Sequence, residues 1–204
     1  MLIKTLPVGQ LETNCYIVTN EESLECVVID PGDESNTILD YMESNKLKCK
    51  AIFVTHGHFD HIGALSAVAE DTGAAVYMNE RDTKVNESIL RHGVELPESV
   101  ISYDDGDVID CAGMRFEIIA TPGHTRGGVT IKFRDALFTG DTLFKGSCGR
   151  VDLPGGDMEE ELRSLKKLCL LEGDYEVYPG HMDSSTLQRE RAFNHYCREA
   201  MKNF

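Results

Sequence analysis

The sequence predicts a single α/β domain, and three observations lead to this prediction. The chain has 204 residues, of which 41% are hydrophobic, so it is long enough to bury one sizeable core. Segments with strand character alternate with segments of helical periodicity. Their order, with strands before helix in the first part and again in the second, indicates two halves of similar architecture.

The N-terminal part begins with short strand-like runs. We expect an antiparallel meander from Leu2–Leu6, Cys15–Thr19 and Cys26–Asp30. The turn sequence Pro31-Gly32-Asp33 ends the third run. A helix is predicted over Ser35–Lys46, because Ile38, Leu39 and Met42 fall on one helical face.

The rest of the chain continues the alternation. Further strands are predicted at Ala51–Val54, Ala75–Met78, near Val108, and at Met114–Ile119, Val129–Phe133, Ala136–Thr139 and Tyr175–Tyr178. Further helices are predicted at Gly63–Asp71, Met158–Leu170 and Ser185–Met201. Residues 80–99 have an irregular pattern with room for one helix.

Composition narrows the class of protein. The formal net charge of −15 would repel phosphate backbones, so nucleic acid is not an expected partner. The seven cysteines are odd in number and scattered, which argues against a disulfide framework and favours a reducing compartment. We find no apolar run long enough for a membrane span and no export signal, so a cytoplasmic location is expected. The sequence leaves the oligomeric state open.

Five of the seven histidines cluster at predicted strand ends or in glycine-containing turns. They stand in three segments: Thr55-His56-Gly57-His58-Phe59-Asp60-His61, Thr121-Pro122-Gly123-His124-Thr125 and Pro179-Gly180-His181. Imidazole and carboxylate ligands suit zinc, iron and manganese. Loops at one end of a sheet can bring such side chains together without straining the strands.

The spacing within these segments predicts two metal positions. In an extended loop that turns into a helix, His56 and His58 would face one ion, and Asp60 and His61 would face a second. The remaining ligands would come from later loops: His124 at the first ion, His181 at the second, and Asp141 bridging both.

This series, H-x-H-x-D-H followed by Pro-Gly-His, Gly140-Asp141 and a second Pro-Gly-His, resembles the motifs of the metallo-β-lactamase superfamily along nearly the whole chain. The resemblance implies an αββα sandwich in which two mixed sheets are flanked by helices and the metals lie at one edge. It also implies a metal-dependent hydrolase with two Zn²⁺ ions, Fe or Mn being alternatives, and a metal-bound hydroxide as nucleophile. Asp60 would orient the water.

Finer features resemble the compact glyoxalase II-like hydrolases, which implies a small thioester substrate such as S-lactoylglutathione. Arg150 matches a basic position that contacts substrate in that family, so we expect it to bind substrate. Two features depart from the family. The C-terminal glutathione-binding helical domain is not expected, because about twenty residues follow His181, and Met182-Asp183 replaces a substrate-binding tyrosine.

Two other functions remain open. Iron persulfide dioxygenases share H-x-H-x-D-H and the segment Cys148-Gly149-Arg150-Val151-Asp152, and there His56, His124 and Asp141 would hold one Fe(II). A metal-holding domain without catalysis is the other possibility. β-Lactam hydrolysis is disfavoured by the glyoxalase II-like motifs. The walls of the substrate pocket, expected near residues 80–99 and 145–157, cannot be derived from the sequence.

Several residues also have a simpler structural interpretation. Asp60 could cap a helix that starts near Ile62, and Asp141 could be a turn residue. We interpret His92 and His195 as structural or exposed, and Cys148 as a buried thiol. Asp30 is expected to orient metal ligands rather than to bind metal itself. The glycine pairs 127–128 and 155–156 match no phosphate-binding motif and are expected to form turns.

Overall fold

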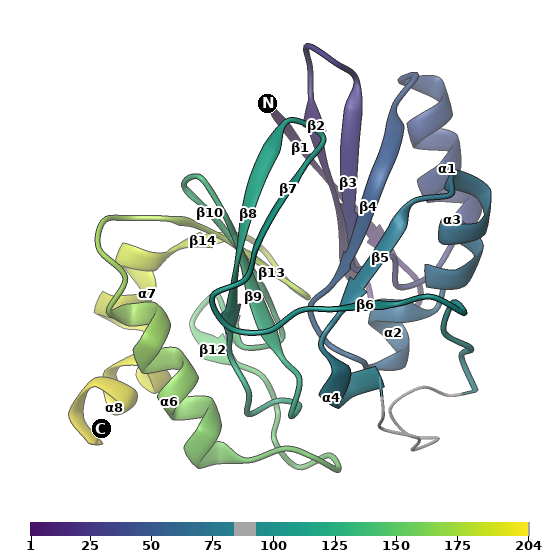
Figure 1. Ribbon diagram of the computed structural model, residues 1–204. Helices are drawn as coiled ribbons and strands as arrows, with labels where there is room; N and C mark the ends of the chain where they lie inside the picture. Colours follow the sequence, from purple (N-terminus) through teal and green to yellow (C-terminus); the bar gives the residue numbers. More distant parts are fainter. Residues whose placement is uncertain (84–92, 204) are drawn as a thin grey trace.

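The computed structural model describes residues 1–83 and 93–203, and in this part of the chain it has four layers (Figure 1). Two mixed sheets face each other. Helices α1 and α3 cover the outer face of the first sheet, and α6, α7 and α8 cover the outer face of the second. The predicted αββα sandwich is confirmed.

The first sheet contains the N-terminal strands in sequence order. They are β1 (Leu2–Val8), β2 (Thr13–Asn20), β3 (Glu25–Ile29), β4 (Lys48–Val54), β5 (Ala75–Met78) and β6 (Ile101–Ser102). The first three pair antiparallel, which confirms the meander, and β3 to β6 pair parallel. The short edge strand β6 was not predicted.

The helices of the first half are α1 (Ser35–Ser44), α2 (Phe59–Ile62), α3 (Leu65–Thr72) and α4 (Glu80–Thr83). The helix predicted over Gly63–Asp71 is present as α3, which begins two residues later than predicted, and the short helix α2 before it was not predicted. The backbone N–H of Ala64 donates to the carbonyl of Pro31, and this contact separates α2 from α3. Of the region 80–99, α4 is helical, residues 93–99 form neither helix nor strand, and the remainder lies outside the described residues.

The second sheet has the order β14-β13-β10-β9-β8-β7. Its strands are β7 (Val108–Cys111), β8 (Met114–Ala120), β9 (Val129–Phe133), β10 (Ala136–Gly140), β13 (Glu176–Pro179) and β14 (Ser185–Thr186). Only β10 and β13 pair parallel. A small hairpin of β11 (Leu143–Phe144) and β12 (Ser147–Cys148) follows β10.

The helices of the second half are α6 (Met158–Cys169), α7 (Leu187–Phe193) and α8 (His195–Asn203). The prediction of one continuous helix over Ser185–Met201 is wrong. Its first two residues pair with β13, and the chain is extended at Asn194. The Asn194 amide donates to the carbonyls of Phe144 and Ser147, and its side-chain oxygen accepts from the backbone of Tyr196, so it ends one helix and caps the next.

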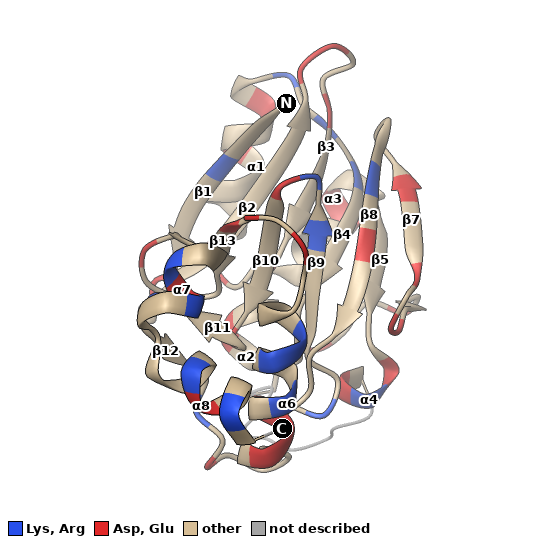
Figure 2. Ribbon diagram, turned by 90° about the vertical axis from the view of Figure 1, so that its left-hand side faces the viewer, with Lys and Arg blue, Asp and Glu red and all other residues tan. Residues whose placement is uncertain are grey.

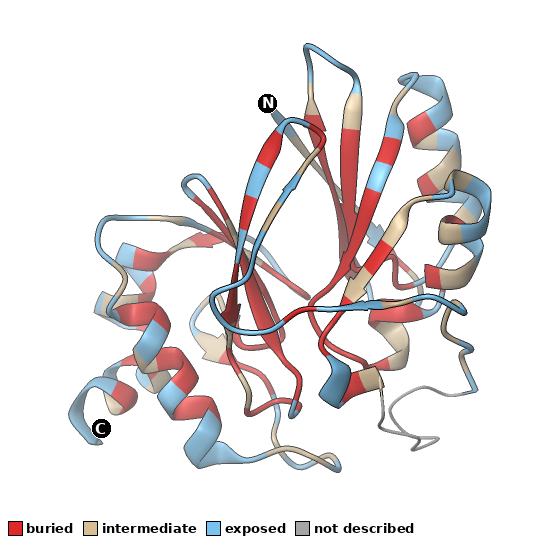
Figure 3. Ribbon diagram, in the orientation of Figure 1, coloured by how far each residue is buried: buried red, intermediate tan, exposed pale blue. Residues whose placement is uncertain are grey.

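Three apolar clusters lie between the four layers (Figure 3). The central one, between the sheets, includes the fully buried rings of Phe53, Phe116 and Phe138. Strand β2 is buried on both faces because Ile17 packs toward the helices and Val18 toward the second sheet. These packed layers form a rigid base for the loops at the sheet edge.

The outer surface carries both signs of charge. In Figure 2 the basic segments of α6, α7 and α8 lie near acidic stretches of helix and loop. The exclusion of nucleic acid stays a prediction. Among the described residues, no helix is long and apolar enough to cross a membrane.

Candidate metal centre

The predicted metal ligands converge at one edge of the sandwich, although they come from four separate segments. His56 follows β4, His124 follows β8, Asp141 follows β10 and His181 follows β13. The parallel pairing of β10 with β13 brings the ends of these two strands together. Convergence therefore depends on the packing of both sheets, not on one loop.

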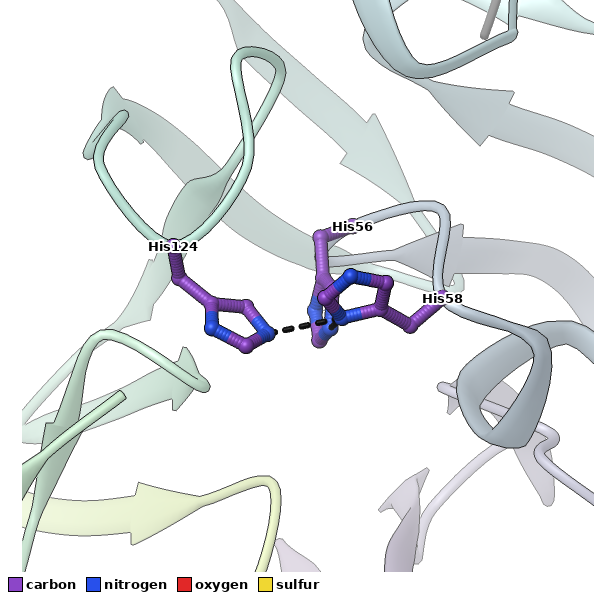
Figure 4. Close-up of side chains that lie close together, drawn as sticks. All are labelled: His56, His58 and His124. Atoms are coloured by element: carbon purple, nitrogen blue, oxygen red, sulfur yellow. Dashed lines mark hydrogen bonds between the residues drawn. The ribbon is translucent and has the colours of Figure 1, made fainter. Parts of the chain in front are cut away.

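Three imidazoles form the tri-histidine cluster of His56, His58 and His124 (Figure 4). Nδ1 of His58 lies 3.0 Å from Nε2 of His56 and 2.7 Å from Nε2 of His124. All three side chains are buried. Three imidazole nitrogens at one point match the ligand set of a zinc or iron site.

The second group, the aspartate cluster, consists of Asp60, His61 and His181. Nε2 of His181 lies 3.2 Å from Oδ2 of Asp60, and Nε2 of His61 lies 3.7 Å from the same oxygen. The hydroxyl of Thr13 donates to Oδ2 of Asp60 at 3.1 Å.

Asp141 lies between the two clusters. Its Oδ2 is 3.4 Å from Nε2 of His124 and 3.6 Å from Nε2 of His181, and its Oδ1 is 3.4 Å from Nε2 of His61. A carboxylate with one group of neighbours from each cluster has the position expected of a bridging ligand.

The donor set fits a metal at this position. Nε2 of His61 and Oδ1 of Asp141 are buried, and apart from ion-pair contacts with each other and between Nε2 of His61 and Asp60, they form no hydrogen bond among the described residues. A buried polar atom without a partner is costly, and coordination of a cation would satisfy both atoms. These residues therefore form metal-binding clusters, and the assignment of each individual ligand stays a prediction.

The pKa shifts of the tri-histidine cluster favour neutral ligands. Burial, followed by the nearby His61, lowers the pKa of His56 well below its usual value. Burial and His124 lower the pKa of His58 to about 3. Both imidazoles are therefore neutral near pH 7, the form that can bind a metal.

The aspartate cluster has the opposite character. Burial would lower the pKa of His61, but the charges of Asp141 and Asp30 raise it well above its usual value. Burial also opposes the ionisation of Asp141, but His61 outweighs this effect and the pKa of Asp141 falls to about 2. The pKa of Asp60 is lowered as well, since its bond with His181 and the charge of His61 outweigh burial. Together with the neighbouring Asp141, this cluster thus places two carboxylates beside two imidazoles, His61 and His181, whose pKa values are raised.

Outer contacts fix the orientation of the candidate ligands. In four histidines, Nδ1 faces away from the clusters and contacts an oxygen. His56 contacts Thr55 Oγ1 at 3.1 Å, and His61 contacts Asp30 Oδ2 at 2.9 Å. His124 contacts the Arg150 carbonyl at 2.7 Å, and His181 contacts the Leu11 carbonyl at 3.1 Å. Asp30 also accepts bonds from the backbone N–H and the hydroxyl of Thr55. With both oxygens engaged, Asp30 has the geometry of an orienting residue.

A cavity of about 490 Å³ opens over the clusters. Its apolar lining consists of Leu11, Phe59, Phe144, Leu153 and Met182. The predicted substrate-binding residue, Arg150, also lines it, but the Arg150 guanidinium forms a two-point contact with Asp152 at 2.7 and 2.8 Å. The cavity is thus mainly apolar above the candidate ligands, and it also contains the paired charge of Arg150.

The structure bears differently on the simpler structural interpretations of Asp60, His195 and Cys148. The capping role for Asp60 is wrong, because α2 begins at Phe59 and places Asp60 inside its first turn. His195 is 81% exposed and Cys148 is buried, as expected. Burial raises the pKa of Cys148 to about 12, so its thiol stays protonated. His92 lies outside the described residues.

Two residues near the clusters were missed by sequence reasoning. Thr13 contacts Asp60, and Asp82 contacts the loops that carry the tri-histidine cluster. Neither belongs to a motif, and Asp82 stands in a segment whose pattern predicted no definite structure. Only the fold brings them to the site.

Comparison with known proteins agrees with this geometry. Residues 8–181 match the family described as the metallo-beta-lactamase superfamily. An uncharacterized protein of Aquifex aeolicus is 39% identical, covering 98% of this chain and 99% of its own. The hydroxyacylglutathione hydrolase GloC of Haemophilus influenzae is 33% identical, covering 95% and 97%. The probable metallo-hydrolase YqgX of Bacillus subtilis is 34% identical, covering 94% and 95%.

Solved structures extend the comparison. The BLEG-1 B3 metallo-beta-lactamase superposes with a TM-score of 0.87 at 29% identity, covering 96% of this chain and 99% of its own. TTHA1623, in a di-iron-bound form, has a TM-score of 0.82 at 34% identity and covers 95% and 99%. ETHE1 from Myxococcus xanthus has a TM-score of 0.80 at 26% identity and covers 100% and 92%.

Proposed function

We propose that this chain, which belongs to the metallo-β-lactamase superfamily, is a metal-dependent hydrolase of small thioesters. The proposal rests mainly on one observation: Asp141 lies between two complete clusters of candidate ligands beneath a substrate-sized cavity. Two ions held about a shared carboxylate suit a hydrolase, because they can activate water and polarise a carbonyl together. We propose zinc as the resident metal, with iron or manganese as alternatives.

A bound divalent metal would supply Lewis-acid chemistry and lower the pKa of water toward neutrality. The protein contributes fixed groups around it. Asp60 is held by Thr13 and His181, so its carboxylate is positioned to orient a water molecule and to accept its proton. Exclusion of bulk solvent by the apolar side chains would strengthen these electrostatic contacts.

The cavity supports a small acyl compound as substrate. Its volume of about 490 Å³ suits a ligand of that size, and its apolar side chains offer contact to an acyl group or to the carbon chain of a thiol. Arg150 is at the rim, where it can meet a carboxylate of the thiol portion. The name of the Haemophilus influenzae relative adds support for a hydroxyacylglutathione substrate.

The first test is hydrolysis of S-lactoylglutathione by zinc-reconstituted protein. We expect turnover that is abolished by a chelator and reduced at least about a hundredfold in Asp60→Asn and His181→Ala. The matched control His195→Ala changes an exposed histidine and should keep full activity. If fully metallated protein cleaved no thioester, that substrate class would be rejected.

A persulfide dioxygenase is the second candidate, favoured by the similarity to ETHE1 and by the Cys148-to-Asp152 segment. It would need one Fe(II) at His56, His124 and Asp141, with positions left open for oxygen. Oxygen consumption by iron-loaded protein with glutathione persulfide tests it. Retention of this activity in His181→Ala, together with no thioesterase activity, would favour the dioxygenase.

A further inference from the structure

Asp82, in the short helix α4, is a buried carboxylate that contacts two separate loops of the metal centre. Its Oδ2 accepts hydrogen bonds from the backbone N–H of Gly57 and the hydroxyl of Thr125, each at 2.8 Å. Its Oδ1 accepts from the backbone N–H of Gly127 at 2.7 Å. All three donors point at one carboxyl group.

These donors have a direct relation to the tri-histidine cluster. Gly57 is the residue between His56 and His58, and Thr125 follows His124. The two loops come from opposite sheets, so nothing in the local sequence fixes their separation. We propose that Asp82 is a positioning residue that sets the distance between the His56/His58 pair and His124, and so tunes metal affinity at the tri-histidine cluster.

The glycines at both contact points match this role. A Cβ atom at Gly127 would lie 2.7 Å from Cγ and Oδ1 of Asp82, and one at Gly57 would lie 3.1 Å from the Asp82 Cβ. A side chain at Gly127 would push the carboxylate away from the backbone N–H that it binds. The glycines thus permit the close backbone approach that a shared acceptor requires.

The aspartate cluster is held by different residues. His61 contacts Asp30, Asp60 contacts Thr13, and His181 contacts the carbonyl of Leu11. The bonds of Asp82 go instead to the loops of the tri-histidine cluster. Loss of the Asp82 contacts should therefore weaken one metal position and leave the other nearly unchanged. This selectivity separates a positioning role from general destabilisation.

The test measures zinc affinity and not turnover, so it stands apart from the choice of substrate. In a His181→Ala background, competition with a chromophoric chelator reports on the tri-histidine cluster. In a His124→Ala background, it reports on the aspartate cluster. Asp82→Asn keeps the shape of the side chain but sets an amide N–H₂ against at least one of the three donors. Thr125→Val removes a single bond.

We expect Asp82→Asn to weaken zinc binding by about tenfold to a hundredfold in the first background and by less than about twofold in the second. Thr125→Val should cause a smaller loss, about threefold to tenfold, in the first background alone. If Asp82→Asn left zinc affinity unchanged in the His181→Ala background, the proposal would be overturned. Equal losses in both backgrounds would also overturn it. If Asp82→Asn does not fold, Thr125→Val decides by the same criteria.

Discussion

Nδ1 of His61 lies 2.9 Å from Oδ2 of Asp30, and this contact turns Nε2 of His61 toward Asp60 and Asp141. The same carboxylate accepts two bonds from Thr55, the residue before His56. Asp30 therefore links the end of β4 to the aspartate cluster. It holds the imidazole in the orientation that a metal requires.

Asp30→Asn tests this link. An amide cannot accept all three bonds, so His61 should lose its fixed orientation, and zinc affinity at the aspartate cluster should fall by about tenfold to a hundredfold. Chelator competition in the His124→Ala background measures this zinc affinity. Asp33→Asn, at a nearby exposed position, is the matched control. An unaltered affinity in Asp30→Asn would contradict the orienting role.

Arg150 and Asp152 offer a prediction about substrate charge. Because the Arg150 guanidinium lies at the cavity rim, Arg150→Ala should raise KM for S-lactoylglutathione by about threefold to tenfold with little change in kcat. Asp152→Asn releases the guanidinium from its competing carboxylate, so it should lower KM. Steady-state kinetics measure both, with Arg163→Ala on α6 as control. If all three variants had the KM of the wild-type protein, we would conclude that Arg150 does not bind the substrate.

Metal binding at the aspartate cluster should depend on pH. The raised pKa values of His61 and His181 mean that, near neutral pH, metal must displace their protons. Apparent zinc affinity in the His124→Ala background should thus rise by up to about tenfold per pH unit for each proton displaced. His56 and His58 have lowered pKa values, so the His181→Ala background should vary much less between pH 6 and 8. If zinc affinity depended more steeply on pH in the His181→Ala background than in the His124→Ala background, these protonation states would be wrong.

Glu161 should make stability depend on pH. Burial raises its pKa to about 9, and its carboxyl oxygens have no hydrogen-bond partner among the described residues. A carboxyl whose pKa is higher in the folded state contributes its stability below the unfolded pKa, and this contribution is lost as pH rises toward 9. Glu161→Gln should therefore raise the free energy of unfolding by about 1–3 kcal/mol at pH 8.

Urea unfolding at pH 5 and pH 8 measures the Glu161 effect. The free energy of unfolding of the wild-type chain should fall as the pH rises from 5 to 8, and that of Glu161→Gln should fall less. Glu160→Gln, on the exposed face of the same helix, is the control and should keep the wild-type difference. If Glu161→Gln showed the full wild-type loss, Glu161 would be ionised in the folded protein at pH 8.

Much of the fold could be predicted because its elements carry local patterns. Strands β8 and β9 have alternating or apolar sequences, and α6 has one apolar face, so their positions matched closely. The C-terminal helix was predicted as continuous because helical periodicity continues through Asn194. What divides it is the set of bonds from Asn194 to Phe144 and Ser147, which lie far away in the sequence.

The seven candidate ligands could be named in advance, since each stands in a short motif whose residue types suit metal binding. By itself, the sequence thus determined the α/β class and most elements, and it named a set of candidate donors whose assignment as ligands stays a prediction. Tertiary structure alone decided which residues hold those donors in place: Asp82 across two loops, Thr13 beside Asp60, and Asp152 against Arg150. Periodicity and motifs record neighbours along the chain, whereas these contacts arise only when two sheets pack face to face and bring distant loops to one edge.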